Sequence, residues 1–151
     1  MSKFAPALAL SAALVSLPFA AAAQSQLDQF EALSERMTEL TYQGLAEQFP
    51  QVQGLLPSAE WDRPMRRAGR CALRAYEAEV GEAGVAAMLA ELASAIGSAR
   101  PSDMFDGTFS AGVPEGLSAQ DVQRINTECG GTELQMQRLA ESGVMQALQA
   151  Q

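Results

Sequence analysis

Apolar residues recur every three or four positions along most of the chain, which is the spacing of amphipathic helices. The first such segment predicts a helix over about 25–48, and Pro50 stops it because proline cannot continue a helix. Alternating β-branched and aromatic runs are missing, so no strand is expected. The apolar stripe of this helix comprises Leu27, Phe30, Leu33, Met37, Leu40 and Gly44.

A second helix is predicted from near Ser58, a suitable N-cap, to near Val80. At about 100° per residue, the next apolar set, residues 85–96, points well over 90° away from this helix's apolar face. One straight helix cannot bury both sets against one core. We therefore expect a break near Gly81 and a third helix over about 82–97 that folds back as a hairpin. The second helix's apolar face contains Trp61, Met65, Ala68, Ala72, Ala75 and Tyr76.

Residues 98–117 are interrupted by prolines and glycines and predict a long crossover loop. Its apolar residues indicate that it packs against the core, and it either connects helices or carries a site. These residues are Met104, Phe105, Phe109 and Val113.

A fourth helix is expected to open at Ser118, with Asp121 completing a capping-box-like pair. Its apolar register continues through the double glycine at 130–131, which predicts one helix to about Glu141, weakened or kinked at the glycines. Gly143 then serves as the C-cap. The residues in register are Val122, Ile125, Cys129, Thr132, Met136 and Leu139.

The first 23 residues have the features of a secretory signal peptide. Lys3 gives a positive start, residues 4–19 are almost wholly apolar, and a small-residue cleavage pattern ends at Ala23. Cleavage there leaves residues 24–151 as a single all-helical domain without a transmembrane anchor. The leader is bacterial in character, so the periplasm, or secretion, is the expected destination.

Two cysteines in an oxidising compartment predict a disulfide between Cys71 and Cys129. Closing the chain between them restricts the unfolded state by roughly 4 kcal/mol. Together these features predict an all-α fold, an antiparallel four-helix bundle. The disulfide joins its second and fourth helices, and the long crossover loop separates its third and fourth.

The composition narrows the possible chemistry. The chain has no histidine, which excludes Ser-His and Cys-His nucleophile pairs and removes the usual transition-metal ligand. We therefore expect no metal site, no cofactor and no enzymatic activity. The formal net charge of −8 becomes −9 without Lys3, which disfavours nucleic acid as a partner.

Five arginines lie on one sector of the predicted second helix, and four acids lie together on the first. A solvated face, docking against an acidic surface within or between chains, and binding of an anionic lipid head group or cell-wall polymer are all open interpretations. The arginines are Arg63, Arg66, Arg67, Arg70 and Arg74. The acids are Asp28, Glu31, Glu35 and Glu39.

Two functional hypotheses follow, and the first is favoured by the charge pattern. It is a non-enzymatic periplasmic interaction or structural protein that binds a protein partner, or itself, through these charged faces. The alternative is a carrier or sensor of a small apolar or amphipathic ligand inside the bundle. Its adaptable lining would comprise Met37, Met65, Met88 and Met136.

Overall fold

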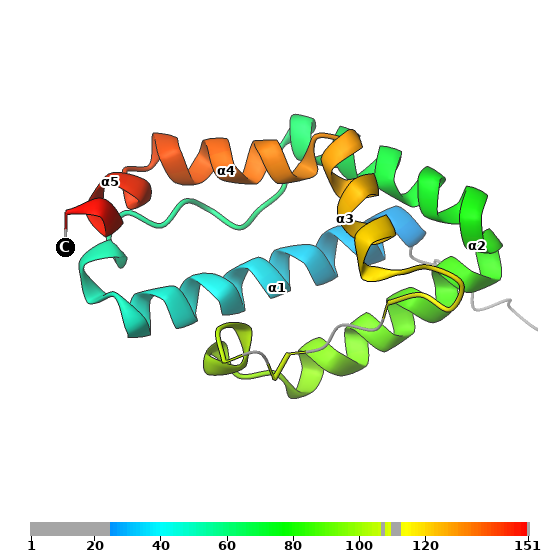
Figure 1. Ribbon diagram of the computed structural model, residues 1–151, viewed down its shortest axis with the longest axis horizontal. Coiled ribbons are helices and arrows are strands. Elements are labelled where there is room, and N and C mark those ends of the chain that lie inside the picture. Colours follow the sequence, from blue (N-terminus) through cyan, green and yellow to red (C-terminus); the bar gives the residue numbers. More distant parts are fainter. Residues whose placement is uncertain (1–24, 107, 110–112, 151) are drawn as a thin grey trace, which may run out of the picture.

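The computed structural model describes residues 25–106, 108–109 and 113–150, and every regular element within them is a helix. The all-helical prediction is therefore confirmed for this part of the chain. The predicted signal peptide lies outside the described residues. Five α-helices and two short 3-10 helices follow one another (Figure 1): α1 (Gln26–Gln48), η1 (Pro50–Val52), α2 (Arg63–Ser98), η2 (Pro101–Met104), α3 (Ala119–Glu128), α4 (Gly131–Glu141) and α5 (Val144–Gln149).

Helix α1 begins and ends where the apolar spacing predicts. The Ser25 hydroxyl caps it by accepting a hydrogen bond from the Asp28 N–H at 3.1 Å. At the other end the Phe49 N–H donates to the Leu45 carbonyl, and Pro50 starts η1. The cap and the proline are adjacent in sequence to the ends they define, which is why this helix could be read directly.

The predicted start of the second helix at Ser58 is wrong, because α2 begins at Arg63. Its N-cap is Asp62, whose carboxylate accepts from the Met65 N–H at 2.9 Å. Pro64 explains the difference, since proline fits the first turn of a helix and breaks its interior. A helix that started at Ser58 would have placed Pro64 in its second turn.

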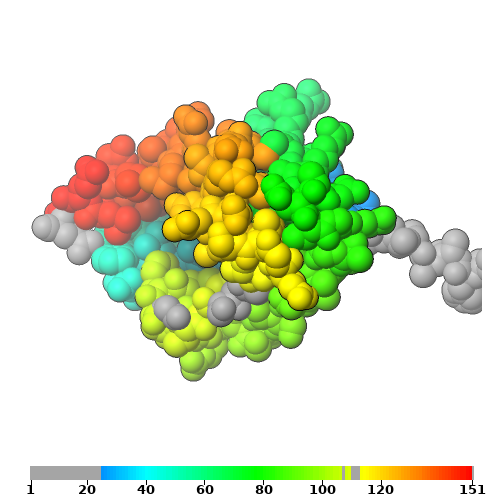
Figure 2. Space-filling view, turned by 45° about the vertical axis from the view of Figure 1, so that its right-hand side comes forward, coloured from blue at the N-terminus to red at the C-terminus, as the bar shows by residue number. Residues whose placement is uncertain are grey.

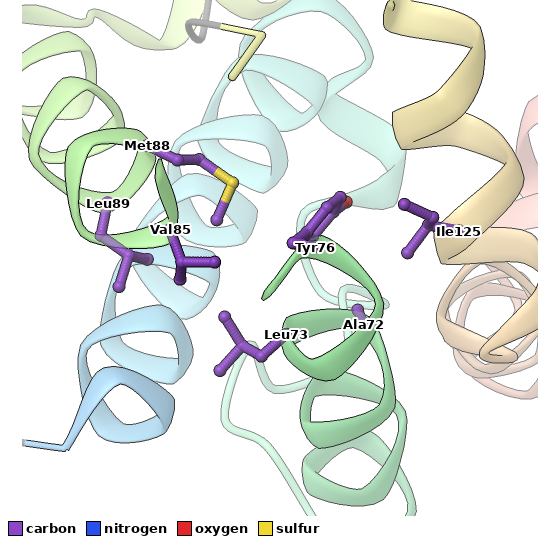
Figure 3. Packing of buried hydrophobic residues seen from close by; sticks show 7 residues of the cluster. All are labelled: Ala72, Leu73, Tyr76, Val85, Met88, Leu89 and Ile125. Atoms are coloured by element: carbon purple, nitrogen blue, oxygen red, sulfur yellow. The ribbon is translucent and has the colours of Figure 1, made fainter. Parts of the chain in front are cut away.

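The predicted break in the middle of α2 is confirmed at Gly81. Its φ of 73° and ψ of 169° lie in a region that only glycine occupies without strain. The two halves of α2 turn back on one another there (Figure 1). Both apolar sets consequently enter one core (Figure 3), which comprises Ala72, Leu73, Tyr76, Val85, Met88, Leu89 and Ile125.

A second buried cluster lies at the far end of α1, where Leu40 packs with Leu92 and Ile96. Met104 and Phe109 of the 98–117 segment pack against it, which confirms that part of this segment covers the core. Its other two apolar side chains are more exposed: Phe105 is 43% and Val113 is 41% accessible. Residues 107 and 110–112 lie outside the described chain.

The predicted single fourth helix is wrong, because the chain forms α3 and α4 with a turn between them. Gly130 has a φ of 79°, a left-handed conformation that ends α3 and begins α4. The apolar spacing does not reveal this break, because the apolar residues of both helices face the same interior. Met136, counted in the predicted register, is 49% exposed as a result.

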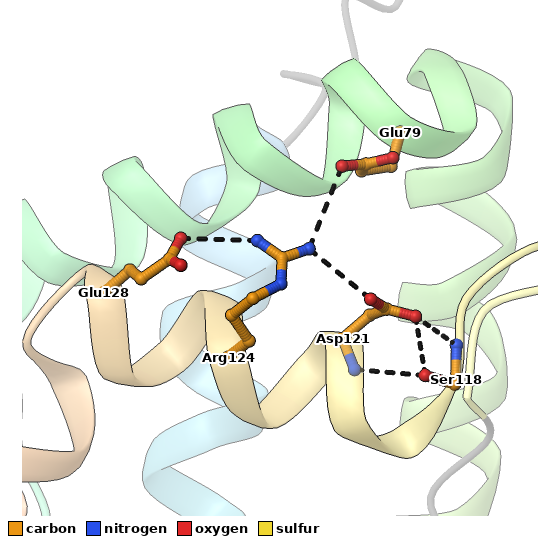
Figure 4. Close-up of polar contacts among 5 residues, drawn as sticks. All are labelled: Glu79, Ser118, Asp121, Arg124 and Glu128. Carbon is orange, nitrogen blue, oxygen red and sulfur yellow. Dashed lines mark hydrogen bonds and ion pairs between the residues drawn. The ribbon is translucent and has the colours of Figure 1, made fainter.

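The predicted cap at the start of α3 is confirmed and appears in Figure 4. The Ser118 hydroxyl accepts from the Asp121 N–H at 3.2 Å, and the Asp121 carboxylate accepts from the Ser118 N–H at 3.0 Å. Arg124 on the same helix lies 3.4 Å from Asp121 and 4.0 Å from Glu79 of α2. This group of polar contacts links α3 to the first half of α2.

The predicted disulfide is confirmed: Cys71 of α2 is bonded to Cys129, which directly follows α3. The Cα atoms are 5.6 Å apart, and 58 positions separate the two residues in sequence. The antiparallel four-helix arrangement is not confirmed. In Figure 1, α1, the second half of α2 and α4 run in one direction, and the first half of α2 runs in the opposite direction.

Among the described residues, α2 alone is long and apolar enough to be considered as a membrane-spanning helix. The helix breaks at Gly81 and both halves contribute residues to the core packed on α1, while 28% of its most apolar 18-residue window is buried. Length and composition of α2 alone are weak evidence for a membrane span.

Gly81→Ala should lower the free energy of unfolding by about 1–3 kcal/mol, because alanine is strained at this φ and ψ. Urea denaturation followed by far-UV circular dichroism measures the change. Gly97→Ala in the same helix is the matched control: its site is open and α-helical, and the substitution should be neutral or stabilising by up to about 1 kcal/mol. Equal effects of the two substitutions would contradict the assigned role of Gly81.

Candidate functional site

A partly open cavity of about 340 Å³ is bounded by α1, both halves of α2, α3, α4 and the residues just before α3. Three of the four methionines expected to line an interior site, Met37, Met65 and Met88, do line it. Met136 does not, since it lies on the exposed side of α4. The cavity has the size and the largely apolar lining that small-molecule sites commonly have.

Trp61 forms one wall of this cavity although it lies outside any helix. Its ring packs edge-on against Phe30, with ring centroids 5.6 Å apart and an angle of 89° between the rings. The ring also lies directly against Gly69 of α2, where any Cβ would overlap it. Gly69 is therefore the position that lets the indole approach the helix backbone.

Arg138 of α4 fixes the extended segment that carries Trp61. Its guanidinium donates to the backbone carbonyls of Ser58 and Glu60 at 3.3 and 3.0 Å, and it lies 3.0 Å from the Asp62 carboxylate. The hydrogen bond from the Met65 N–H, followed by that from Arg138, holds the pKa of Asp62 below its usual value. One side chain thus connects α4, the segment before α2 and the N-cap of α2.

The lining combines apolar walls with a few polar groups. Among the residues that the structure describes, no charged side chain lines the cavity. Gln135 of α4 donates to the Tyr42 hydroxyl of α1 at 2.7 Å, which joins these two helices beside it. The polar lining residues are Ser34, Thr38, Tyr76, Asn126, Thr132 and Gln135.

Helix α3 lines the cavity with Val122 and Asn126, and it lies at the surface beside α2 in the space-filling view (Figure 2). Its position depends on the disulfide, because Cys129 itself lines the cavity and is bonded to α2. Val122, which also lines it, packs against the main core. The disulfide therefore holds part of the cavity wall in addition to joining two helices.

The structure divides the five predicted arginines into two groups. Arg66 turns toward α1, where its Nη2 lies 3.0 Å from Asp28 and its Nε lies 2.6 Å from Glu31. The Glu31 contact is an ion pair without hydrogen-bond geometry, since that buried oxygen accepts no hydrogen bond from the described residues. The two charged stripes therefore meet within the chain, but only through this one arginine.

The other four arginines, here called the outer arginine row, make no ion pair or side-chain hydrogen bond with any described residue. All four are exposed and lie on the side of α2 opposite its buried residues. At a rise of about 1.5 Å per residue the row extends over roughly 16 Å. It consists of Arg63, Arg67, Arg70 and Arg74.

The remaining two acids of the α1 stripe have other partners. The Glu35 carboxylate accepts a hydrogen bond from the backbone N–H of Trp61 at 2.6 Å, and Glu39 pairs with Arg36 at 2.8 Å. Glu35 thereby helps to position Trp61 against the cavity. The predicted acidic contact surface is in this structure largely engaged by the protein itself.

No family model matches the chain, and comparisons with curated proteins and with solved structures find no match. The site is therefore argued from its own geometry.

Sequence reasoning missed Arg138, Gln135 and the glycine beneath Trp61. No spacing rule links Arg138 or Gln135 to residues about 80 or 90 positions earlier in the chain. The one available signal was Gly69 in the middle of an apolar helix face, where glycine indicates a close approach. Its partner could not be identified from the sequence.

The only two tyrosines, Tyr42 and Tyr76, should both titrate above pH 10 in the native protein. Burial raises the pKa of each phenol above 10.0, and this outweighs the lowering by Gln135 at Tyr42 and by Asn126 at Tyr76. Because the folded pKa exceeds the unfolded one, the contribution to stability is complete below pH 10 and is lost as the pH rises through the folded pKa.

Absorbance at 295 nm during an alkaline titration measures both phenols. In 6 M guanidinium chloride the midpoint should fall to the ordinary value near 10. A native midpoint at that same ordinary value would contradict the burial of these two side chains.

Proposed function

We propose that the protein is a non-enzymatic carrier or sensor of a small, mainly apolar ligand held in the interior cavity. The single observation that supports this proposal is the cavity of about 340 Å³ with its methionine, tryptophan and phenylalanine walls. The charge pattern of the sequence favours an interaction protein over a ligand carrier. The cavity leads us to prefer the carrier. Methionines suit this role because their side chains adapt to varied ligand shapes.

We also propose that the protein works outside the reducing cytosol, in the periplasm, after cleavage near Ala23. The disulfide is compatible with an oxidising compartment. The leader-like composition of residues 1–23 supports the same destination. A carrier in an aqueous compartment needs an apolar space for a poorly soluble molecule, which agrees with the proposed role.

Native mass spectrometry of the protein isolated from the periplasm of its own cell tests the carrier proposal. We expect a bound small molecule whose mass is lost on denaturation. Ala68→Leu should reduce its occupancy at least threefold, because Ala68 is buried and lines the cavity, so that a larger side chain fills the space. Ala78→Leu, on the exposed side of the same helix, should leave the occupancy unchanged.

Thr132→Leu provides a second test if Ala68→Leu disturbs folding, since Thr132 lines the cavity from an exposed position on α4. Circular dichroism establishes that each variant is folded. A protein that carries no small molecule, or one that retains it equally in all three variants, would contradict the proposal.

The outer arginine row supports a second candidate function, binding of an acidic protein surface. Four exposed guanidinium groups without partners among the described residues are unusual in a chain of net charge −8. Complementary charge steers association and sets the orientation of a partner. Arg66 is excluded from this surface, because it is already engaged with α1.

Crosslinking in the cell followed by recovery of the protein tests this second role. Replacing Arg67, Arg70 and Arg74 with Glu should abolish any specific crosslink without affecting the fold, since none of them pairs with a described residue. Replacing Arg36 with Glu changes charge on another exposed surface and should preserve the crosslink. An unchanged set of crosslinked partners in the triple variant would exclude the row as a contact surface.

A further inference from the structure

Two of the polar lining residues of the cavity, Thr38 and Gln135, are linked to one stretch of α1. Thr38 and Tyr42 lie one helical turn apart on α1, and Gln135 of α4 is bonded to the Tyr42 hydroxyl at 2.7 Å. Thr38 and Gln135 both line the cavity. The Thr38 hydroxyl of α1 and the Gln135 amide of α4 thus both belong to the lining, and both are linked to the stretch of α1 that carries Tyr42.

Both groups have hydrogen-bonding capacity left. The Thr38 hydroxyl donates to the Ser34 carbonyl at 2.9 Å, and its oxygen remains able to accept. Gln135 uses one amide atom for Tyr42, while the other makes no hydrogen bond to any described residue. Together they offer a ligand two hydrogen-bonding positions.

No charged side chain among the described residues lines the cavity, and Arg138, whose charge acts on the Tyr42 hydroxyl, is paired with Asp62. Glu39, next to Thr38 in the sequence, pairs with Arg36, and Glu35 accepts from the backbone N–H of Trp61 at 2.6 Å. Moving a carboxylate or an ammonium group from water into an uncharged site is strongly unfavourable unless a partner is present. A neutral polar group meets no such penalty when it is hydrogen-bonded.

We propose that the ligand is an uncharged, mainly apolar molecule with one hydroxyl, carbonyl or amide group that hydrogen-bonds to Thr38 and Gln135. This inference rests on the proposed carrier function and specifies its ligand class. The cavity volume of about 340 Å³ equals roughly ten water-sized groups, which sets the size of the molecule near that of an eight-carbon alcohol.

The chain contains one tryptophan, and Trp61 lines the cavity, so its fluorescence reports occupancy directly. Delipidated full-length mature protein is titrated at pH 7 with 1-octanol, octanoate and octylammonium, which share a chain length and differ in charge. We expect 1-octanol to bind at least about tenfold more tightly than either charged probe, because the charged head groups find no partner.

Thr38→Val tests the position of the polar group, and Thr41→Val is its matched control. Both threonines lie on α1 and donate to the carbonyl four residues earlier at 2.9 Å, but only Thr38 lines the cavity. Thr38→Val should weaken 1-octanol binding roughly two- to tenfold, the effect of one hydrogen bond. Binding of toluene, which has no polar group, should not change, and Thr41→Val should alter neither probe.

The possible failures are distinguishable. Charged probes that bind as tightly as 1-octanol would overturn the ligand class while leaving the carrier role in place. An equal loss of toluene and 1-octanol binding in Thr38→Val would overturn the assigned position of the polar group. If no probe binds although native mass spectrometry finds a retained molecule, the ligand class is wrong and the carrier function stands; if neither is found, both fail.

Discussion

The structure depends on one constraint: the two apolar faces of α2 point in different directions, and both must be buried. A continuous helix would leave one of them in water, at a cost that increases with the apolar area exposed. Gly81 allows both faces to be buried, because the chain reverses there with backbone angles that strain any other residue. The two halves then pack on α1, and Tyr76 from one half meets Met88 from the other in the same cluster (Figure 3).

The three-segment core formed by α1 and the halves of α2 determines where the remaining helices can attach. Helix α3 joins it through the buried Ile125 and the adjoining Val122, and α3 and α4 are also held by a few covalent and polar connections. These are the disulfide, the Arg124 and Arg138 contacts, and the hydrogen bond from Gln135 to Tyr42. The space they leave is the cavity, and unfilled apolar volume of this kind is destabilising because its lining lacks contacts.

The disulfide offsets part of that cost through its effect on the unfolded chain, which is roughly 4 kcal/mol for a closed segment of this length. A bound ligand would offset more of it, since occupancy of the native state alone stabilises the fold. The cavity and the disulfide are therefore connected physically. Cys129 takes part in both, as a bonded sulfur and as a lining residue.

The first half of α2 has an apolar inner face and a positively charged outer face. Its inner face, with Met65, Ala68 and Gly69, lines the cavity, and its outer face carries the arginine row. Arg66 lies at the boundary and belongs to the fold, because it binds the acids of α1. The proposed ligand site and the proposed partner surface therefore use different residues of one helix and can be separated by substitution.

The sequence by itself determined the features that depend on neighbouring positions. The phase change of the apolar pattern required a break near Gly81, and the capping box located the start of α3. The disulfide followed because only two cysteines are present. The start of α2 also lay within reach of local reasoning, since Pro64 restricts it more strongly than a serine cap does.

The tertiary structure alone decided the rest, because those features depend on which distant segments meet. The turn at Gly130 was hidden, since α3 and α4 both face the interior that the first two helices create. Three contacts join residues that no periodicity connects. They are the ion pair of Arg66 with Asp28, the packing of Trp61 on Gly69, and the hydrogen bond from Gln135 to Tyr42. A cavity is the space that packed segments leave unfilled, so its volume and its uncharged lining exist only once the chain has folded.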